Sequence, residues 1–449
     1  MAQVYLSAGL GNLASFVAGT VLTWSSPEMD KLASNDSNVR PFDEPATENE
    51  QSWISSIFAL GAVFGPFIFG FLADKIGRKY TLLSTAPPFA LCYILLAFGK
   101  SVYLFLVARF IMGLALGGVF TLIPMYLSEI ADNTNRGAMS SSMNVFLCFG
   151  LLFSYSLGPY VSVMAFNIVL AIAPCAFFVL YFFFAPESPT YYVSKNRDEE
   201  AKAVLQRLRG TGVDIQEEIS GLQKKQLEDG KGSFRDLFQS KGLIKALCIS
   251  VGLVAFQQFS GINAILFYAQ SIFQQAGSTL APEVCSILIG GVQFGTSFIT
   301  PLISDKLGRK VLLLISAAGM VVAEVPLGVY CFLKDKGNDV QSISFLPIVC
   351  LITYILMYNV GFGPLPWTVM GEIFPNNVKA IASTLTAAIC WFMGFLIGYF
   401  FKSISGNIGM GPSFWIFSAC AASAIPFTWF LLIETKGKSI TQIQEELNR

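Results

Sequence analysis

The sequence predicts an all-α membrane protein in which twelve transmembrane helices form two pseudo-symmetric six-helix bundles. Three observations predict this fold. The 449 residues are 54% hydrophobic and only 13% charged, about half the charged share of a soluble protein, and the mean hydropathy is +0.60. Apolar stretches near the length that crosses a bilayer recur along the whole chain. Charged motifs of the first half return in the same order in the second half.

The apolar stretches are the predicted spans. Because backbone polar groups need partners in lipid, we expect helices rather than open strands. The spans cover 5–26, 52–72, 80–98, 103–127, 138–158 and 165–185 in the first half, and 244–273, 284–304, 311–333, 345–370, 380–401 and 412–433 in the second. The first stretch has no basic segment or small-residue cleavage site, so we interpret it as a retained helix and not a signal peptide.

The distribution of Lys and Arg predicts the orientation. If both termini are cytoplasmic, the inner loops hold 22 of these residues and the outer loops six, while Arg109 lies within a span. Such an excess marks the cytoplasmic side. The triplet Asn35-Asp36-Ser37 then lies in an outer loop, which makes Asn35 a candidate glycosylation site. We therefore expect a multi-pass protein of the plasma membrane.

A polar segment divides the chain into two halves. Residues 186–243 carry mixed charges and two helical runs, 197–209 and 216–228, and we interpret them as a cytoplasmic helical linker. The predicted domains are an N-terminal six-helix bundle over 1–185, this linker, a C-terminal six-helix bundle over 244–433 and a short cytoplasmic tail over 434–449.

Three charged motifs indicate that the halves are duplicated. They recur 231, 243 and 247 residues apart, as Asp74–Lys79 and Asp305–Lys310, Glu129 and Glu372, and Glu187 and Glu434. Ordered matches at a nearly constant offset are typical of a duplicated unit. Two such bundles are expected to enclose a central site and to expose it alternately to each side by rocking.

The repeated charges fall on the cytoplasmic face and form a candidate gate. Its residues are Asp74, Arg78, Glu129, Arg136, Glu187, Asp305, Arg309, Glu372 and Glu434. We expect the four glutamates to pair with these arginines and neighbouring lysines, in a clamp that holds the bundles shut on that side. The alternative is topology anchors or solvated charges of little energetic worth. The clamp is favoured because acids recur together with bases, whereas an anchor needs only bases.

Taken together, these motifs resemble the sugar porter branch of the major facilitator superfamily over essentially the whole chain, and insect facilitated trehalose and hexose transporters most of all. The matching residues are Asp74–Lys79, Arg109, Glu129, Arg136-Gly137, Pro186–Pro189, Gln257–Asn263, Asp305–Lys310, Gly361–Trp367, Glu372–Pro375 and Glu434–Gly437. The resemblance implies the major facilitator fold and facilitated transport of a sugar such as trehalose or glucose.

The candidate substrate site centres on amides in an otherwise apolar span. Gln257, Gln258 and Asn263 suit a sugar, because an amide offers both donors and an acceptor to a hydroxyl. On an ideal helix Asn263 lies about 120–140° from the glutamines, so the three converge only if the helix unwinds, which Gly261 permits. The alternative is that these amides join helices.

The resemblance extends this site. It assigns sugar contacts to Gln257, Gln258, Asn263, Gln293, Trp367 and Asn144. This sequence departs from the family pattern at several positions, where Asn144 replaces the common Gln, Gln293 replaces a frequent Asn, Cys390 and Gly394 replace polar residues, and Ile433 replaces Pro.

Proton coupling is not expected, because coupled relatives carry an acid in the first span. Here that stretch reads Ala18-Gly19-Thr20-Val21, without a carboxylate. Glu324 is an intramembrane carboxyl group and so a functional candidate by default, although we favour a protonated or packing-paired structural group. Arg109 is expected to fix its span through backbone carbonyls or a carboxylate.

Several function classes are excluded or disfavoured. The chain has no histidine and a formal net charge of zero, which argues against histidine-based catalysis or metal binding and against nucleic-acid binding. The nine cysteines all lie in predicted spans and suggest neither a disulfide framework nor a metal site. We expect no enzyme, no cofactor and no obligate protein partner, only a sugar and membrane lipid. A proton-coupled sugar symporter, a sugar sensor with little transport and a transporter of another small solute remain alternatives.

Overall fold

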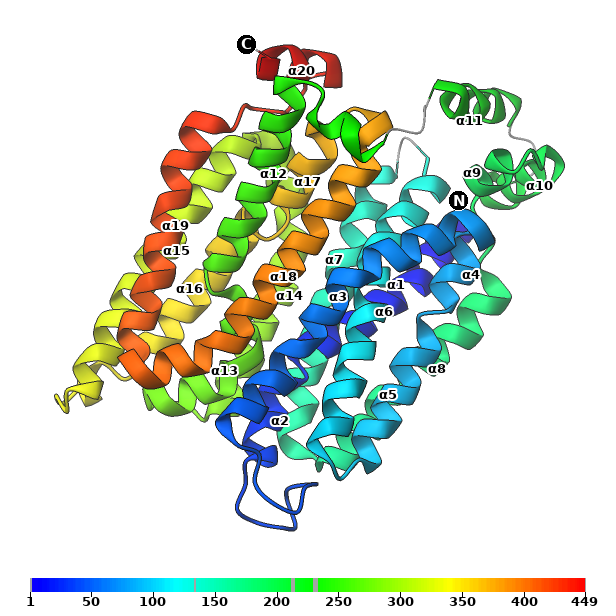
Figure 1. The fold of residues 1–449 in the computed structure, drawn as a ribbon. Helices are drawn as coiled ribbons and strands as arrows, with labels where there is room; N and C mark the ends of the chain where they lie inside the picture. The colour runs from blue at the N-terminus through cyan, green and yellow to red at the C-terminus, as the bar shows by residue number, and fades with distance from the viewer. Residues whose placement is uncertain (1, 133–134, 211–214, 229–232, 449) are drawn as a thin grey trace.

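The computed structural model describes residues 2–132, 135–210, 215–228 and 233–448. Within these residues, twelve helices are long and apolar enough to cross a membrane. Figure 1 shows them as two bundles side by side, which confirms the predicted fold class. The side chains of Arg136, Asp305 and Lys306 lie outside the description.

The first bundle contains the six N-terminal spans. They are α1 (Ala2–Thr23) with the short α2 (Ser25–Leu32), α3 (Glu48–Ile76), α4 (Arg78–Leu83) with α5 (Ala86–Phe98), α6 (Val102–Ile130), α7 (Arg136–Leu157) and α8 (Val163–Phe184). Helix α3 begins earlier than predicted because a capping box satisfies its first N–H groups. The Thr47 hydroxyl accepts from the Glu50 N–H, and the Glu50 carboxylate accepts from the Thr47 N–H at 2.8 Å.

The second bundle contains the C-terminal spans, two of which are broken. They are α12 (Lys241–Phe259) with α13 (Ile262–Ala276), α14 (Pro282–Leu307), α15 (Arg309–Asp335), α16 (Leu346–Val360) with α17 (Leu365–Ile373), α18 (Asn376–Ile408) and α19 (Met410–Leu431). The breaks lie at Ser260-Gly261 and before Leu365, next to the Gly and Pro residues that the sequence singles out.

Among the described residues, four further α-helices lie outside the bundles. The linker forms α9 (Pro189–Ser194), α10 (Asp198–Arg209) and α11 (Gln216–Glu228), and the last two match the predicted runs. The predicted tail contains α20 (Ile440–Asn448), which the sequence analysis missed. Figure 1 places these helices and both ends of the described chain at one end of the molecule, called here the linker end.

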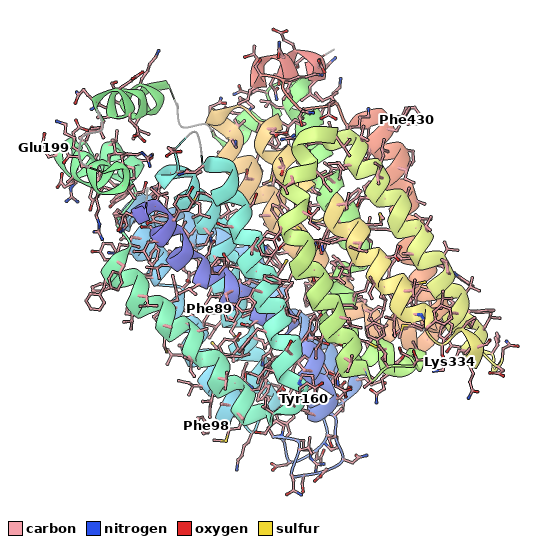
Figure 2. All side chains as sticks on the ribbon, turned by 180° about the vertical axis from the view of Figure 1, so that it is seen from behind. Phe89, Phe98, Tyr160, Glu199, Lys334 and Phe430 are labelled. Atoms are coloured by element: carbon pink, nitrogen blue, oxygen red, sulfur yellow. The ribbon has the colours of Figure 1, made fainter. Side chains whose placement is uncertain are left out.

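Small residues let spans approach closely, as in other membrane bundles. A Cβ atom built on Gly113 of α6 would lie 1.9 Å from the Phe58 carbonyl oxygen of α3, and one on Gly150 of α7 would lie 2.1 Å from the Phe16 carbonyl oxygen of α1. Large apolar side chains such as Phe98 and Phe430 are exposed instead and line the outer surface (Figure 2), as expected of a protein surrounded by lipid.

The two bundles contact each other toward the opposite end of the molecule. Tyr268 has a non-helical backbone that kinks α13. First-bundle side chains bind the carbonyls just before the kink. Tyr155 donates to the Leu266 carbonyl at 2.9 Å, and Ser25 donates to the Phe267 carbonyl at 3.2 Å. These cross-bundle hydrogen bonds join the bundles at that end.

Candidate substrate site and charged rim

The break between α12 and α13 brings the three predicted amides together. Gln257 and Gln258 end α12, and Asn263 lies in the first turn of α13. Between them Gly261 has φ +84°, a left-handed conformation that glycine adopts readily. The Asn263 side-chain amide donates to the Gln258 side-chain oxygen. The helix therefore unwinds where the sequence predicted, and two of the amides meet directly.

The remaining amide groups find partners on neighbouring helices. Gln258 Nε2 donates to the Cys390 sulfur of α18 at 2.9 Å. Gln257 Nε2 donates to the carbonyls of Phe362 at 2.6 Å and Gly363 at 2.8 Å, which the break between α16 and α17 leaves outside a helix. The amide cluster, meaning Gln257, Gln258 and Asn263, thus joins both helix breaks of the second bundle to α18.

The other predicted sugar contacts stand apart from this cluster. Gln293 of α14 is 5% exposed, and its side-chain oxygen has no partner among the described residues. The Asn144 side-chain oxygen of α7 lies 3.9 Å from the Cys148 sulfur, and Trp367 of α17 is half-buried. In the described part of the chain, no hydrogen bond joins these three residues to the amide cluster. Their role as sugar contacts stays a prediction.

Trp391 of α18, which follows Cys390, is not among the sugar contacts predicted from the sequence. Its indole is 7% exposed and its N–H lacks a partner among the described residues. The ring packs edge-on against Phe120 of α6 at 5.1 Å between centroids, across the bundle interface. An indole inside a span, next to the Cys390 that the family pattern flags, was the signal available in the sequence.

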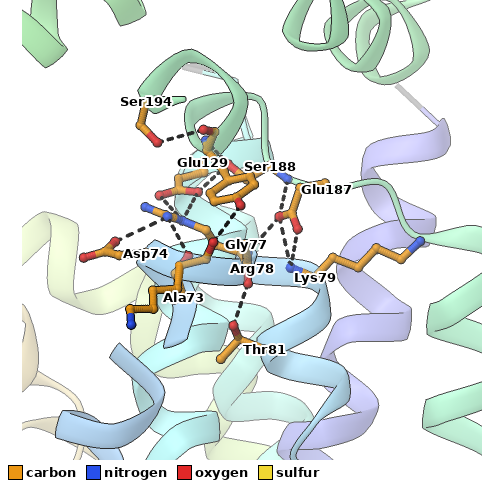
Figure 3. Close-up of polar contacts among 12 residues, drawn as sticks. Ala73, Asp74, Gly77, Arg78, Lys79, Thr81, Glu129, Glu187, Ser188 and Ser194 are labelled. Carbon is orange, nitrogen blue, oxygen red and sulfur yellow. Dashed lines mark hydrogen bonds and ion pairs between the residues drawn. The ribbon is translucent and has the colours of Figure 1, made fainter. Parts of the chain in front are cut away.

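The first charged motif forms a compact network at the linker end (Figure 3). Arg78 Nε lies 3.0–3.1 Å from both Glu129 carboxylate oxygens, and Arg78 Nη1 lies 3.5 Å from Asp74. The Glu187 carboxylate accepts the backbone N–H groups of Arg78 at 2.8 Å and Lys79 at 3.0 Å. Glu187 thereby caps α4 and Glu129 ties it to α6.

The second motif repeats this arrangement. Arg309 Nη2 donates to Glu372 at 2.8 Å, and the Glu434 carboxylate accepts the N–H groups of Arg309 and Lys310 at 3.0 Å each. The Thr435 hydroxyl donates to Glu372 at 2.6 Å. The duplication read from the sequence is therefore a duplication of contacts.

The two networks, called here the charged rim, lie within single bundles. The first pairs residues of the first bundle with each other, and the second does the same for the second bundle. The sequence predicted that these glutamates clamp the two bundles together in the shut state. Among the described residues, the ion pairs of Glu129 and Glu372 instead join residues of one bundle. Arg136 and Asp305, also expected in the gate, have side chains outside the described set.

The two capping glutamates differ in electrostatics. Burial raises the pKa of Glu187 above its ordinary value, and the backbone N–H groups of Ser188, Lys79 and Arg78 only partly offset this. Burial acts in the same direction on Glu434, which is less deeply placed. For Glu434 the backbone N–H groups of Lys436, Arg309 and Lys310 together outweigh burial and lower the pKa.

Arg109 is held by backbone, as predicted. Its guanidinium donates to the carbonyls of Ile54 at 3.2 Å and Val21 at 3.0 Å, between the rings of Trp24 and Phe58. Glu324 is 1% exposed, and neither carboxyl oxygen has a hydrogen-bond partner in the described ranges.

Two further expectations can be placed as well. Asn35 is exposed in the loop between α2 and α3, where its side chain is open to modification. All nine cysteines are free.

Comparison with known proteins agrees with this architecture. A family model described as "Sugar (and other) transporter" matches residues 12–447. The chain is 37% identical to the facilitated trehalose transporter Tret1 of Bombyx mori, covering 89% of this chain and 80% of that protein. It is 34% identical to Tret1 of Aedes aegypti, with 97% of this chain aligned, but spans only 54% of that relative's length.

Solved structures share the fold. The xylose transporter XylE from E. coli, in a partially occluded inward-open conformation, superposes with a TM-score of 0.82 at 22% identity, covering 98% of this chain and 100% of that one. The same protein, described as an MFS proton:xylose symporter bound to 6-bromo-6-deoxy-D-glucose, gives 0.80 at 22% identity and 99% coverage of each chain. With a family model matched over nearly its whole length, this multi-pass membrane protein belongs to the sugar transporter family, a family of transporters and not of enzymes.

Proposed function

We propose that this chain is a facilitative transporter that moves a neutral sugar, trehalose or a hexose such as glucose, down its gradient across the plasma membrane. The observation that carries the proposal is the amide cluster at the break between α12 and α13. Relatives at 34–37% identity are named facilitated trehalose transporters. Because this chain spans about half of some of them, the activity is proposed and not transferred.

The chemistry of the cluster fits an uncharged polyol. Amides can donate to and accept from sugar hydroxyls, and an indole such as Trp391 can cover the apolar face of the ring. The side-chain oxygen of Gln293 and the indole N–H of Trp391, which have no partner among the described residues, are further candidates for sugar contacts. An anion carrier would require a basic residue at the site, but the buried Arg109 is engaged by carbonyls of the first bundle.

Alternating access is the mechanism that we infer. The contacts of Tyr155 and Ser25 with α13 would close the opposite end in this state, and rocking of the bundles would break them. We assign the linker end to the cytoplasm, in line with the Lys and Arg distribution. Both termini would then be cytoplasmic, and Asn35 would lie outside.

We infer that transport is passive. Helix α1 contains no Asp or Glu, so it offers no titratable acid in the stretch where coupled relatives are expected to carry one. A proton-coupled symporter is the second candidate, favoured by the buried carboxyl group of Glu324, which has no partner among the described residues.

Uptake into proteoliposomes tests both proposals. Labelled trehalose and glucose should enter down their gradients, at rates unchanged by a proton gradient or an uncoupler. Gln258→Ala should reduce uptake at least tenfold, because sugar hydroxyls lose an amide partner worth about 1.5 kcal/mol or more. Gln274→Ala, at an exposed site on α13, is the matched control. Uptake that requires a proton gradient would replace the passive proposal by the symporter.

A further inference from the structure

Two residues on the face of α18 toward the amide cluster offer it few polar atoms. Cys390 and Gly394 lie one helical turn apart on this face. The Cys390 sulfur is 2.9 Å from Gln258 Nε2 and 3.8 Å from Gln257 Oε1. Gly394 has no side chain, and a Cβ atom there would lie 2.6 Å from Asn263 Nδ2. The thiol is therefore the polar side chain that these two α18 positions offer to the amides.

The partners of the amide donors differ greatly in strength. Gln257 Nε2 has two carbonyl oxygens, at 2.6 and 2.8 Å, and Asn263 Nδ2 has the side-chain oxygen of Gln258. Among the described residues, the partner of Gln258 Nε2 is the Cys390 sulfur, which is a weak acceptor. A buried amide needs some partner, but this one is the easiest to displace. Gln258 Nε2 is thus the donor of the cluster that a sugar hydroxyl can engage at least cost.

We propose that Cys390 is an affinity-determining residue of the substrate site. Its thiol holds the Gln258 amide in the empty site as a weak placeholder, and an incoming sugar hydroxyl displaces it and takes the amide hydrogen. This proposal rests on the proposed function, because it requires a sugar at the amide cluster.

The proposal predicts opposite effects for two small substitutions. Cys390→Ser puts a stronger acceptor at the same place, so the empty site is stabilised and the dissociation constants for glucose and trehalose should rise about three- to tenfold. Cys390→Ala removes the placeholder and leaves the Gln258 amide without a partner, so the dissociation constant should stay equal or fall. The maximal uptake rate at saturating sugar should change less than KM in both variants.

Equilibrium binding to the purified protein, followed by tryptophan fluorescence, and uptake kinetics in proteoliposomes measure these effects. Cys420→Ser on α19 is the control, because it makes the same chemical change on a helix from which no hydrogen bond reaches the amide cluster in the described part of the chain. Thermal unfolding and gel filtration verify that each variant folds.

The outcomes separate the two proposals. If the unmodified protein binds and transports sugar but Cys390→Ser binds as tightly as it does, the placeholder role is overturned. Weakening of Cys390→Ala to the same extent as Cys390→Ser also overturns it, since that pattern indicates a packing role or a direct sugar contact. If the unmodified protein neither binds nor transports either sugar, the proposed function itself fails.

Discussion

At the scale of single residues, the site depends on the missing side chain of Gly394 as much as on its amides. Gly394 lets the backbone of α18 touch the amide pair, because a Cβ atom there would lie 2.6 Å from Asn263 Nδ2 and 3.3 Å from Gln258 Oε1. The sequence identified the amides by their chemistry in an apolar span. It did not reveal that a bare backbone on another helix holds them, because contacts between distant segments leave no local pattern.

Gly394→Ala should therefore impair transport without unfolding the protein. The new methyl group must push Asn263 and Gln258 aside, which misplaces two donors, and displacement of such groups by about 1 Å can cost a hundredfold in function. Uptake should fall at least tenfold, with normal amounts of protein in the membrane. Gly291→Ala on α14, where a Cβ atom meets nothing within 4 Å, should leave uptake unchanged. Equal uptake by both variants would show that the amide pair is not used.

At the scale of elements, helix positions were largely readable from the sequence, but helix ends and breaks were only partly so. All twelve spans follow from hydropathy, because an apolar stretch in lipid must pair its backbone polar groups internally and therefore forms a helix. The capping box of Thr47 extends α3, and the interruption between α4 and α5 splits a span that read as continuous. The rim glutamates were found by repetition, yet the role of Glu187 and Glu434 as caps of α4 and α15 needed coordinates.

The different pKa values of the two capping glutamates predict different effects of neutral substitution. The lowered pKa of Glu434 means that folding favours its ionised form, so this contribution is present at neutral pH and is lost as the pH falls through the pKa of the folded state. Glu434→Gln should cost about 0.3–1 kcal/mol at neutral pH, and the difference from the unmodified protein should shrink toward about pH 4.

The pKa shift of Glu187 has the opposite sign. Its raised pKa means that folding favours the protonated form. The ionised carboxylate therefore destabilises the folded state, and this penalty grows as the pH rises above the ordinary pKa of a glutamate. Glu187→Gln should therefore cost less at neutral pH than Glu434→Gln. Thermal unfolding of both purified variants between about pH 4 and about pH 8 provides the comparison. A larger loss for Glu187→Gln at neutral pH contradicts the argument.

At the scale of the whole molecule, charges at the opposite end favour the closed arrangement of the bundles. Lys402 of α18 donates to the Gln51 side-chain oxygen of α3 and is attracted by Asp30 and Glu48, which all belong to the first bundle. On the same face, Ser271 donates to Asp30 at 3.3 Å. The sequence could not pair these groups, because they lie more than 200 residues apart and share no repeat.

Lys402→Met should shift the molecule toward opening at that end. The substitution removes a donor and a charge that cross the bundle interface, while Asp30 and Glu48 keep theirs. Exposed ion pairs contribute about 0.2–1 kcal/mol, and a loss of about 1 kcal/mol changes a two-state ratio roughly fivefold. Lys336→Met, which removes an exposed lysine directly after α15 at the same end, is the matched control.

Distances between spin labels report this shift. Tyr160 and Asn407 are exposed positions in the first and second bundle, and Figure 2 shows Tyr160 at the end opposite the linker. Labels there should sample longer distances in Lys402→Met, in a background where exposed Cys175 and Cys248 are replaced by Ser. The same change should strengthen sugar binding from that side, because less free energy is spent on opening before the sugar enters. Identical distance distributions in Lys402→Met and Lys336→Met would show that hydrogen bonds such as those of Tyr155 and Ser25, and not charge, keep this end closed.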